Sequence, residues 1–532
     1  MPTSQSAGSP RPIGLPPVSL AALAGVAEVA VSTRGQHEVS RHGIGVTGVT
    51  LRSADVRPGD LFAALPGSVT HGAAHVGSAA AAGAVAVLTD PAGYAMMLTQ
   101  SDAAGLPVLI SGDPRACLGQ VASAIYGHPS RQLRVIGVTG TSGKTTTCFL
   151  LEAALTASGL RTGLIGTVAA RIDGRSLPSS LTTPEAPDLQ ALFAIMVQRG
   201  VDVVAMEVSS HALALGRVSG TEFAVGAFTN LSQDHLDFHG DMEHYFAAKR
   251  LLFDGRARAE VIVIDDDYGR RLAVDRPQAT TVSGADGAVA DWTVHVTAGA
   301  PGIQHLTVTG PDGEQFDASI SLPGSFNVTN AVTALACVRA AGLDASAVAK
   351  GLADVQVPGR MQRVDVGQPF LALVDYAHKP AALKSALAAV REHCAGRIIL
   401  VVGAGGDRDH GKRPMMGQIA TRDADLVIVT DDNPRSEDPA EIRRQILVGA
   451  VEGAGIGSAI KAAVEEIGDR RAAIIAAVQA AHAGDAILVA GKGHEQGQDI
   501  GGVVHPFNDV DELKAALADA LGAAPGKAGL TP

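Results

Sequence analysis

The chain has little cysteine, few aromatic residues, no excess of positive charge and no apolar run long enough to cross a membrane. Its four cysteines are too scattered for a disulfide framework or a cysteine metal site, which favours reduced thiols. The formal net charge of −12 argues against a nucleic-acid partner. Because no stretch combines the length and apolarity of a membrane span, we expect no membrane insertion and a cytoplasmic protein. The apolar stretch 18–31 contains Glu28 and lacks a lysine-rich start, so it favours a short helix over a signal peptide.

The abundant residues of this chain are small or aliphatic. Apolar residues make up 46% of the 532 positions, and 62 are glycine, a composition typical of an α/β protein. One hydrophobic core cannot serve a chain of this length, so three domains are expected. The expected segments are a disordered terminus at 1–17, a small α/β domain at 18–133, a central sheet domain at 134–357, a C-terminal Rossmann-like domain at 358–521 and a flexible tail at 522–532.

A glycine-rich turn between a strand and a helix is the strongest local signal. Residues 133–147 read L-R-V-I-G-V-T-G-T-S-G-K-T-T-T, a β-branched run followed by glycines, one lysine and a helix start. Glycines let backbone N–H groups approach phosphate oxygens, the helix N-terminus adds partial positive charge, and Lys144 can reach the terminal phosphates. Thr145 supplies a hydroxyl for Mg²⁺. Five residues separate Gly137 from Gly143, one more than the standard spacing. The pattern predicts a nucleoside triphosphate site.

Two further patterns in the central region can hold a metal. A buried strand ends in Glu207, as nucleotide-binding sheets present a carboxylate to Mg²⁺. The segment 231–240, L-S-Q-D-H-L-D-F-H-G, follows the next strand, and a helix carrying Lys249 comes after it. The competing interpretations are a salt-bridged acid for Glu207, a capping or surface role for His235 and an exposed helix position for Lys249.

Three other features of the central region are structural predictions. Thr182 or Thr183 can cap the helix that follows them. Residues 293–322 predict a β-hairpin that turns at 310–313, G-P-D-G. Asn327 and Asn330 lie about one helical turn apart and therefore share a helix face.

The last region predicts a second open α/β sheet whose strands each end in a polar cluster. Such a sheet binds its ligand at the carboxyl ends of the strands. The loop 403–406 does not match the full dinucleotide fingerprint, so a dinucleotide site is rejected. The clusters are D-Y-A-H-K-P at 375–380, G-A-G-G-D-R-D-H-G-K-R at 403–413, D-D-N-P-R at 431–435 and G-K-G-H-E at 491–495.

Taken together, these motifs resemble one family, the Mur ligases, which form amide bonds at the expense of ATP in bacterial cell-wall synthesis. The resemblance covers nearly the whole chain, and D-N-P-R at 432–435 resembles the branch that adds meso-diaminopimelate. The motifs, in chain order, are G-V-T-G-T-S-G-K-T-T, M-E-V-S-S-H, N-L-S-Q-D-H-L-D-F-H-G, F-N-V-T-N-A, D-Y-A-H-K-P and G-K-G-H-E.

The resemblance implies the residues that bind ATP and metal. Catalytic roles fall to Lys144, Glu207, His235 and Lys249, the last as a carbamate, which turns a cation into an oxygen ligand. Two Mg²⁺ ions are implied: Thr145 and Glu207 would hold one, and His235 and the Lys249 carbamate would hold the other. The residues implied in ATP binding are Thr141, Ser142, Gly143, Lys144, Thr145, Thr146, Thr147, Asn327, Arg360, Asp375 and His378.

The resemblance also implies the substrate residues. This chain departs from the family at Arg52, where the family has an acid, and at Leu215, where it has a polar residue. The uridine end of UDP-N-acetylmuramoyl-dipeptide maps to Leu51, Ser53, Ser68, Val69 and Thr70, and the muramoyl-dipeptide end to Thr182, Thr183, Ser209 and Arg217. The diaminopimelate site maps to Arg408, Asp432, Asn433, Pro434, Arg435, Gly491 and Glu495.

The implied reaction activates the D-glutamyl side-chain carboxylate as an acyl phosphate, which the incoming amine then attacks. Arginine grips a carboxylate with two parallel bonds, so Arg435 can select the extra carboxylate of diaminopimelate over L-lysine. Three alternatives are kept: addition of L-lysine on the same scaffold, a folylpolyglutamate-synthase-like ligase, and a nucleotide-binding regulatory protein without turnover. A monomer or a weak dimer is expected.

Overall fold

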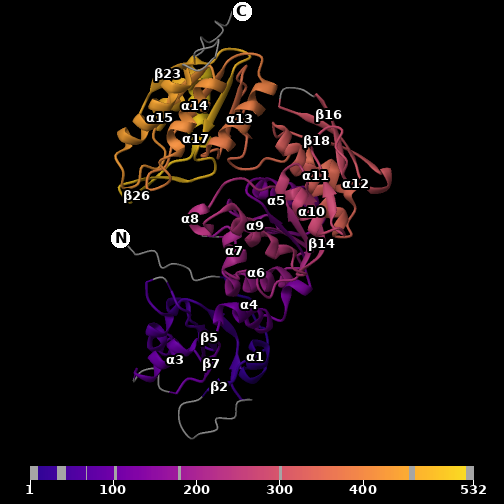
Figure 1. Ribbon diagram of the computed structural model, residues 1–532, viewed down its shortest axis with the longest axis vertical. Coiled ribbons are helices and arrows are strands. Elements are labelled where there is room, and N and C mark those ends of the chain that lie inside the picture. Colours follow the sequence, from indigo (N-terminus) through magenta and orange to yellow (C-terminus); the bar gives the residue numbers. More distant parts are fainter. Residues whose placement is uncertain are drawn as a thin grey trace, which may run out of the picture. The chain divides into compact units, whose positions relative to one another are not determined.

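The computed structural model describes residues 10–32, 43–67, 69–100, 105–177, 181–298, 302–454 and 462–522. The chain divides into two compact units, and Figure 1 labels the helices and strands of the chain. The first comprises residues 1–293, 309–314 and 332–351, and the second comprises 294–308, 315–331 and 352–532. No helix within the described ranges is both long and apolar enough to cross a membrane.

A five-stranded sheet forms the N-terminal part of the first unit. Its strand order is β2-β7-β6-β5-β4, with β4 to β7 parallel and β2 antiparallel. Asp90 and Asp113 cap the helices α3 and α4, each of which begins with proline. The strands are β2 Val31–Ser32, β4 Gly48–Thr50, β5 Asp60–Ala63, β6 Ala86–Thr89 and β7 Val108–Ile110, and the helices are α1 Leu20–Ala27, α2 Val76–Ala81, α3 Pro91–Leu98 and α4 Pro114–Ile125.

An eight-stranded sheet forms the rest of the first unit. Its order is β11-β10-β9-β12-β8-β13-β14-β15, and the six strands from β9 to β15 are parallel. Strands β10 and β11 form an antiparallel hairpin, and β10 pairs with β9 at the edge of the sheet. The turn between β10 and β11 is Asp173-Gly174, and both residues have positive φ. The strands are β8 Arg134–Thr139, β9 Thr162–Ile165, β10 Ala170–Ile172, β11 Arg175–Leu177, β12 Val203–Glu207, β13 Phe223–Phe228, β14 Ala257–Val263 and β15 Thr280–Val282.

The order of the parallel strands explains where a site can form. The helices that follow the strands include α5 Lys144–Ala157, α6 Ala186–Gln198, α7 Ser210–Ala214, α8 Leu236–His239, α9 Met242–Arg250 and α10 Asp267–Asp275. Strand β8 is paired with β12 on one side and β13 on the other. Because parallel strands end at the same edge of a sheet, the loop after β8, the acid that ends β12 and the residues after β13 are brought together.

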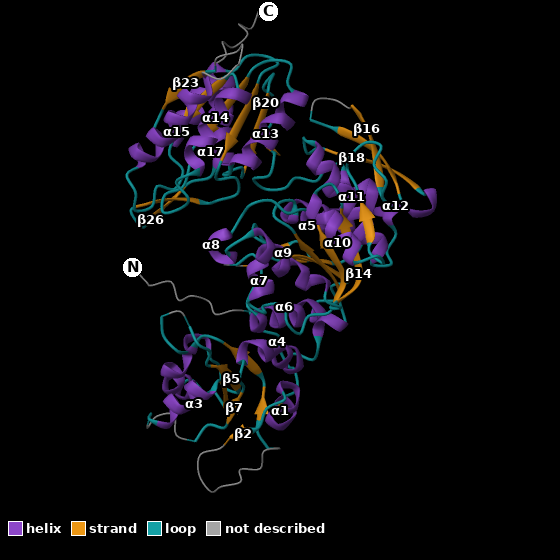
Figure 2. Ribbon diagram, in the orientation of Figure 1, coloured by secondary structure: helices purple, strands orange, loops and turns teal. Residues whose placement is uncertain are grey.

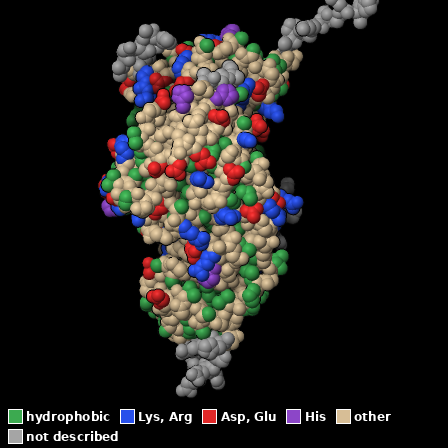
Figure 3. Space-filling view, turned by 90° about the vertical axis from the view of Figure 1, so that its right-hand side faces the viewer, with side chains coloured by type: hydrophobic (Ala, Val, Ile, Leu, Met, Phe, Trp, Pro, Cys, Tyr) green, Lys and Arg blue, Asp and Glu red, His purple; other side chains and the backbone are tan. Residues whose placement is uncertain are grey.

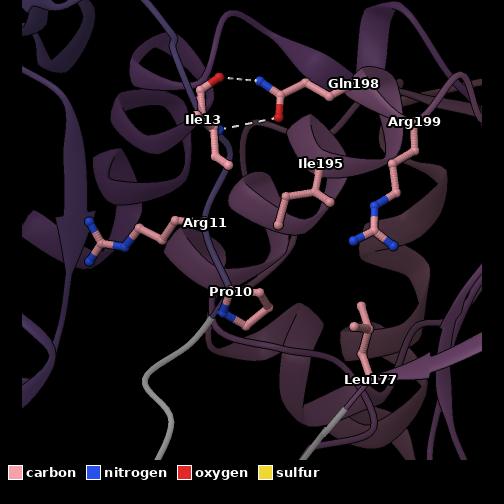
Figure 4. A pocket seen from close by; sticks show the side chains of 7 residues that line it. All are labelled: Pro10, Arg11, Ile13, Leu177, Ile195, Gln198 and Arg199. Carbon is pink, nitrogen blue, oxygen red and sulfur yellow. Dashed lines mark hydrogen bonds between the residues drawn. The ribbon is translucent and has the colours of Figure 1, made fainter.

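A segment expected to be disordered instead makes specific contacts. The Arg11 guanidinium pairs with the buried carboxylate of Asp60 at 2.5 Å. The backbone of Ile13 exchanges two hydrogen bonds with the Gln198 side chain, at 3.2 and 2.6 Å (Figure 4). Arg11, Ile13 and Gln198 line a pocket of about 180 Å³ together with Pro10, Leu177, Ile195 and Arg199. Arg11 and Ile13 are thus held by specific contacts, and residues 1–9 lie outside the described ranges.

A six-stranded sheet with helices on both faces dominates the second unit (Figure 2). Its order is β19-β20-β24-β21-β22-β23, parallel except for β19. Apolar residues of α13, α14 and α15 pack on one face, and those of α16 and α17 on the other. The strands are β19 Gln362–Arg363, β20 Leu371–Asp375, β21 Ile398–Val402, β22 Leu426–Val429, β23 Ala463–Glu466 and β24 Ala486–Ala490, and the helices are α13 Pro380–His393, α14 Lys412–Asp423, α15 Pro439–Ala454, α16 Arg470–Ala480 and α17 Asp509–Gly522.

Three smaller β elements complete the described chain. One pairs β1 Val18–Ser19 with β3 Gly45–Val46 antiparallel. The predicted hairpin that turns at 310–313 is present, formed by β17 Gln304–Thr309 and β18 Gln315–Ile320, with β16 Thr293–Ala298 as a third strand. The helices α11 Ser325–Ala340 and α12 Ala345–Ala349 follow. A second hairpin pairs β25 Gly497–Ile500 with β26 Val503–Pro506. On the face shown in Figure 3, acidic and basic side chains are interspersed.

Candidate active site

The predicted phosphate loop has the expected geometry. Strand β8 ends at Thr139, and helix α5 begins at Lys144. Gly140 and Gly143 have φ angles of +148° and +87°, in the region that favours glycine. The Lys144 ammonium donates to the carbonyls of Gly140 and Thr141 at 2.8 and 2.9 Å, so it lies over the loop. The N-terminus of a helix and an ammonium both attract anions, so the start of α5 with Lys144 is suited to bind phosphate.

The residues after β13 hold this loop, a role that the sequence did not reveal. The Asn230 side-chain oxygen accepts from Ser142 N at 2.9 Å, and its amide donates to Ser142 O at 3.1 Å. The Thr229 hydroxyl donates to the same carbonyl at 2.6 Å. A Cβ on Gly140 would lie 1.9 Å from that hydroxyl oxygen, so the two segments are in close contact. In the sequence, the only indication of a role for Asn230 is its position directly before the L-S-Q-D-H segment.

Glu207 ends β12 as a buried carboxylate, 1% exposed. Thr167 donates to it twice, from its backbone N–H at 2.8 Å and from its hydroxyl at 3.1 Å. No ion pair with Glu207 occurs among the described residues, so the salt-bridged alternative is wrong. A buried carboxylate beside the hydroxyl-bearing start of α5 has the donor chemistry that a hard divalent cation prefers.

Lys249 is buried, with 1% of its surface accessible. The interpretation of Lys249 as an exposed helix residue is therefore also wrong. Its ammonium donates to Gly140 O at 2.8 Å and lies 4.6 Å from the centre of the Tyr245 ring. Tyr245 in turn places its hydroxyl 3.2 Å from the Thr141 hydroxyl. Helix α9 therefore brings a lysine and a tyrosine against the phosphate loop.

His235 lies in a group of rings near α9. Its backbone is left-handed, with a φ of +52°, and it precedes α8 without capping that helix through its side chain. Its Nε2 is 3.2 Å from an Asp234 carboxylate oxygen. The rings of His211 and Tyr245 lie 4.8 and 6.2 Å away, between centroids. Burial lowers the pKa of His211 and of the neighbouring His239. The described ranges contain no preformed group of three metal-ligating side chains, so the Mg²⁺ ligand set stays a prediction.

The four residues assigned to the muramoyl-dipeptide end lie together beside Glu207. The Thr183 hydroxyl donates to Glu207 O at 2.8 Å and accepts from Ser209 N at 3.1 Å. Thr182 and Thr167 share a hydroxyl–hydroxyl bond of 3.0 Å. Arg217 donates to Thr183 O at 3.4 Å. The capping alternative for the threonines is wrong, because Glu185 precedes α6 and no side chain caps it.

The residues assigned to the uridine end lie in the loops after β4 and β5. Leu51 follows β4, and Ser53 begins a 3₁₀ turn. Val69 is 96% exposed, and Ser68 lies outside the described residues. Arg52 forms an ion pair with Asp55 at 2.6 Å. This assignment stays a prediction.

In the second unit, the D-N-P-R loop follows β22 and meets the G-K-G-H-E loop that follows β24. Asp432 and Asn433 are buried, and the Lys492 side chain is completely buried. The Lys492 ammonium donates to Asn433 Oδ1 at 2.9 Å and to Glu495 Oε2 at 3.0 Å. The Asn433 amide donates to the same Glu495 oxygen at 2.7 Å. Lys492 was not among the predicted site residues, although it lies within the G-K-G-H-E motif.

Arg435 points its guanidinium toward the loop after β21, where it donates to Gly406 O at 2.5 Å. Its backbone has a φ of +52°, which is unusual for a residue with a side chain. Gly491 has a φ of +119°, and a Cβ there would lie 2.7 Å from an Asp432 carboxylate oxygen. Arg408 belongs to the same loop as Gly406. The predicted amino-acid residues thus come from loops at one edge of the sheet.

A second cluster at this edge contains Arg360, Asp375 and His378, which were assigned to ATP. The Arg360 guanidinium lies 4.5 Å from the centre of the Tyr376 ring. Asp375 accepts from two backbone N–H groups, and burial raises its pKa. Burial also lowers the pKa of His378 to about 3 and that of His494 to about 4, so both rings are neutral at pH 7. Tyr376 and His494 were not predicted.

Asn327 and Asn330 share a buried helix face, as predicted. The Asn327 amide donates to Pro323 O at 2.7 Å, and its oxygen accepts from the Asn330 amide at 3.2 Å. This pair orients the Asn327 side chain at the start of α11. Its assignment to adenine stays a prediction.

The phosphate loop, the lysine that begins α5 and the acid that ends the neighbouring β12 define a nucleotide-binding α/β protein. Sequence comparison narrows this class. Residues 45–126 match the Mur ligase family, catalytic domain; residues 138–338 match the Mur ligase middle domain; and residues 359–493 match the Mur ligase, glutamate ligase domain. The chain belongs to the Mur ligase family.

Individual relatives are similar over nearly the whole chain. The UDP-N-acetylmuramoyl-L-alanyl-D-glutamate–2,6-diaminopimelate ligase of Streptomyces avermitilis is 50% identical over 522 residues, which cover 97% of this chain and 99% of that protein. The enzyme of the same name from Corynebacterium efficiens is 52% identical over 481 residues, 90% of each chain.

Solved structures share the fold. A UDP-N-acetylmuramoyl-L-alanyl-D-glutamate–2,6-diaminopimelate ligase is 30% identical, with a TM-score of 0.66 over 95% of this chain and 99% of that chain. The folylpolyglutamate synthase of Mycobacterium tuberculosis, solved with ADP and AMPPCP, is 21% identical with a TM-score of 0.56 over 76% of this chain and 94% of that chain, a likeness of fold.

Proposed function

We propose that the protein joins meso-diaminopimelate to UDP-N-acetylmuramoyl-L-alanyl-D-glutamate at the expense of ATP, in peptidoglycan precursor synthesis. The observation that carries this proposal is the buried D-N-P-R loop, which combines an arginine with the linked Asn433 and Glu495 side chains. The names of relatives at 50% and 52% identity support it.

The chemistry begins with the D-glutamyl carboxylate, which does not react with an amine at neutral pH. Transfer of the γ-phosphoryl group of ATP makes it an acyl phosphate, and attack by the amine then gives the amide and phosphate. Lys144 would bind the terminal phosphates and offset the repulsion between two anions. Thr145 and Glu207 would hold one Mg²⁺ and His235 would help to hold a second, and the two ions would supply charge neutralisation when bound.

Lys249 is proposed to act as a carbamate. As an ammonium it can only donate, as it does to Gly140 O. Carbamylation would convert this buried amine into a carboxylate-like group close to the phosphate loop, able to share in holding Mg²⁺. The support is its burial against the loop rather than in solvent.

The amino-acid site is proposed to bind both the carboxylate and the ammonium groups of the incoming amino acid. Arg435 would bind a carboxylate, while Asp432 and Glu495 would take an ammonium. L-Lysine lacks the second carboxylate, so it would leave the arginine without its partner. Addition of L-lysine is the second candidate, because its ammonium could use the same acids.

ATP and a UDP-linked substrate are cytoplasmic nucleotides, so the cytoplasm is the proposed location. A monomer is the proposed state, and sedimentation velocity would test it.

The proposed reaction is tested by incubating the purified protein with ATP, Mg²⁺, UDP-N-acetylmuramoyl-L-alanyl-D-glutamate and meso-diaminopimelate, followed by mass spectrometry of the UDP-linked product. The expected product carries one diaminopimelate joined with loss of water, and it does not form without ATP. If the UDP-linked substrate stays unchanged while ATP binds, the regulatory alternative replaces the ligase.

A further inference from the structure

The hairpin β25–β26 is joined to the D-N-P-R loop by four hydrogen bonds. The Gln498 amide donates to Asp432 O at 2.8 Å, and Asp499 N donates to Asn433 Oδ1 at 3.0 Å. Arg435 N donates to Asp499 O at 2.9 Å, and Gly501 N donates to the Arg435 carbonyl at 2.7 Å. The hairpin therefore contacts three of the four residues of this loop.

These bonds bracket Arg435 from both sides of its backbone. Its N–H and its C=O are both bound by the hairpin, and its α-carbon has a left-handed φ of +52°. Such a conformation in a residue with a side chain persists only when the surroundings impose it. The hairpin therefore fixes the direction from which the Arg435 side chain leaves the backbone.

The hairpin itself has little hydrophobic anchoring. Ile500, Val503 and Val504 are 44%, 58% and 67% exposed, so their side chains add little core burial. Its two-residue turn, Gly501-Gly502, has φ angles of +60° and +80°, the type I′ geometry that suits a tight hairpin. An element without a core depends on its polar contacts for position, and four of those contacts go to the D-N-P-R loop.

We propose that the hairpin 497–506 is a positioning element that determines amino-acid specificity by holding Arg435 in its selecting orientation. The proposal rests on the proposed function, since it assigns the diaminopimelate carboxylate to Arg435. The coupling is reciprocal: an amino acid that fixes Arg435 also fixes the hairpin, and one that leaves Arg435 without a partner does not.

The turn offers a test that leaves the binding residues intact. The double substitution Gly501→Val with Gly502→Val places β-branched residues at two positive φ angles. It should open the hairpin without a clash, because no heavy atom lies within 4 Å of a Cβ added at either glycine. A matched control is Gly367→Val, in the same unit at φ +99°, also with no heavy atom within 4 Å.

We expect kcat/KM for meso-diaminopimelate to fall by about tenfold or more in the double variant, because displacement of a binding group by about 1 Å costs up to 100-fold. The preference for meso-diaminopimelate over L-lysine should fall by a similar factor, while the KM values for ATP and the UDP-linked substrate change by less than about twofold. Gly367→Val should behave as wild type. An unchanged preference in a double variant whose hairpin amides exchange rapidly would overturn the proposal.

Hydrogen exchange on the wild-type protein tests the same idea without a variant. With ATP analogue and UDP-linked substrate present, meso-diaminopimelate should slow amide exchange in the peptide covering 497–506 by about tenfold or more, and L-lysine should not. Equal exchange with and without meso-diaminopimelate would overturn the proposal. If wild-type protein formed no diaminopimelate product at all, the proposed function would fail instead, and the two failures are thus distinguishable.

Discussion

Gly140→Ala is the smallest substitution that tests whether the loop after β8 binds the nucleotide. The new Cβ would lie 1.9 Å from the Thr229 hydroxyl oxygen, whereas ordinary contacts begin at 3.4 Å. Either the loop or the Thr229 side chain must therefore move by about 1.5 Å, the difference between these two distances. The φ angle of +148° adds strain, because side chains disfavour this region.

The expected magnitude follows from what this movement disturbs. Three hydrogen bonds from Thr229 and Asn230 hold Ser142, each worth about 1 kcal/mol. The carbonyl of Gly140 also accepts from Lys144 and Lys249. A displacement of about 1 Å in such a loop costs on the order of 100-fold in rate. We therefore expect kcat/KM for ATP to fall by about 100-fold, equivalent to about 2.7 kcal/mol.

The assay is steady-state phosphate release against ATP concentration, with binding of a non-hydrolysable ATP analogue measured by calorimetry. Gly159→Ala is the matched control, because Gly159 follows the other end of α5 at φ +88° and no heavy atom lies within 4 Å of its added Cβ. It should change kcat/KM by less than about twofold. Adding Thr229→Ala to Gly140→Ala removes the obstructing hydroxyl, and we expect the pair to recover about tenfold relative to Gly140→Ala alone.

Two results would refute the reasoning. If Gly140→Ala binds the analogue and turns over as wild type does, the loop is not the nucleotide site. If Gly159→Ala is as damaged as Gly140→Ala, the loss comes from α5 as a whole rather than from the contact with Thr229.

Two further predictions concern the second unit. Lys492→Met removes the buried ammonium that donates to Asn433 and Glu495, so we expect the KM for meso-diaminopimelate to rise by about tenfold or more. The control, Lys384→Met on the exposed face of α13, should leave this KM unchanged. If both variants have the kinetics of the wild type, Lys492 has no positioning role. His378 has a folded pKa of about 3, below its ordinary 6.5, so the folded state binds fewer protons than the unfolded state and stability is lost as pH falls from about 6.5 toward 3. Urea unfolding should accordingly show that His378→Gln loses less stability than wild type between pH 7 and pH 5, by about 2 kcal/mol, and equal losses would contradict a buried neutral ring.

Features set by neighbouring residues were predictable from the sequence. The strand–glycine–lysine–helix order at 133–157 fixes the phosphate loop locally, and the G-P-D-G turn fixes the hairpin at 304–320. The loop after β8 and Glu207 lie at the same edge of the sheet, because the parallel neighbours β8 and β12 both end there. The D-N-P-R and G-K-G-H-E loops meet for the same reason, since β22 and β24 both flank β21.

Features set by distant residues were not predictable. Asn230 holds a loop 88 positions earlier in the chain, and Arg11 finds its partner 49 positions later. Lys492 is buried by contacts that only the folded sheet creates, and its own motif does not say whether it faces solvent. The Asp173-Gly174 turn is different, because an Asp-Gly pair is a local hairpin signal.

The most direct test of the central claim is one competition measurement. Purified protein receives ATP, Mg²⁺, UDP-N-acetylmuramoyl-L-alanyl-D-glutamate and equal concentrations of meso-diaminopimelate and L-lysine, and mass spectrometry gives the ratio of the two UDP-linked products. We predict that the diaminopimelate product exceeds the lysine product by about 100-fold or more, since a half-buried arginine left without its carboxylate is penalised. Equal amounts, or an excess of the lysine product, would contradict selection by Arg435.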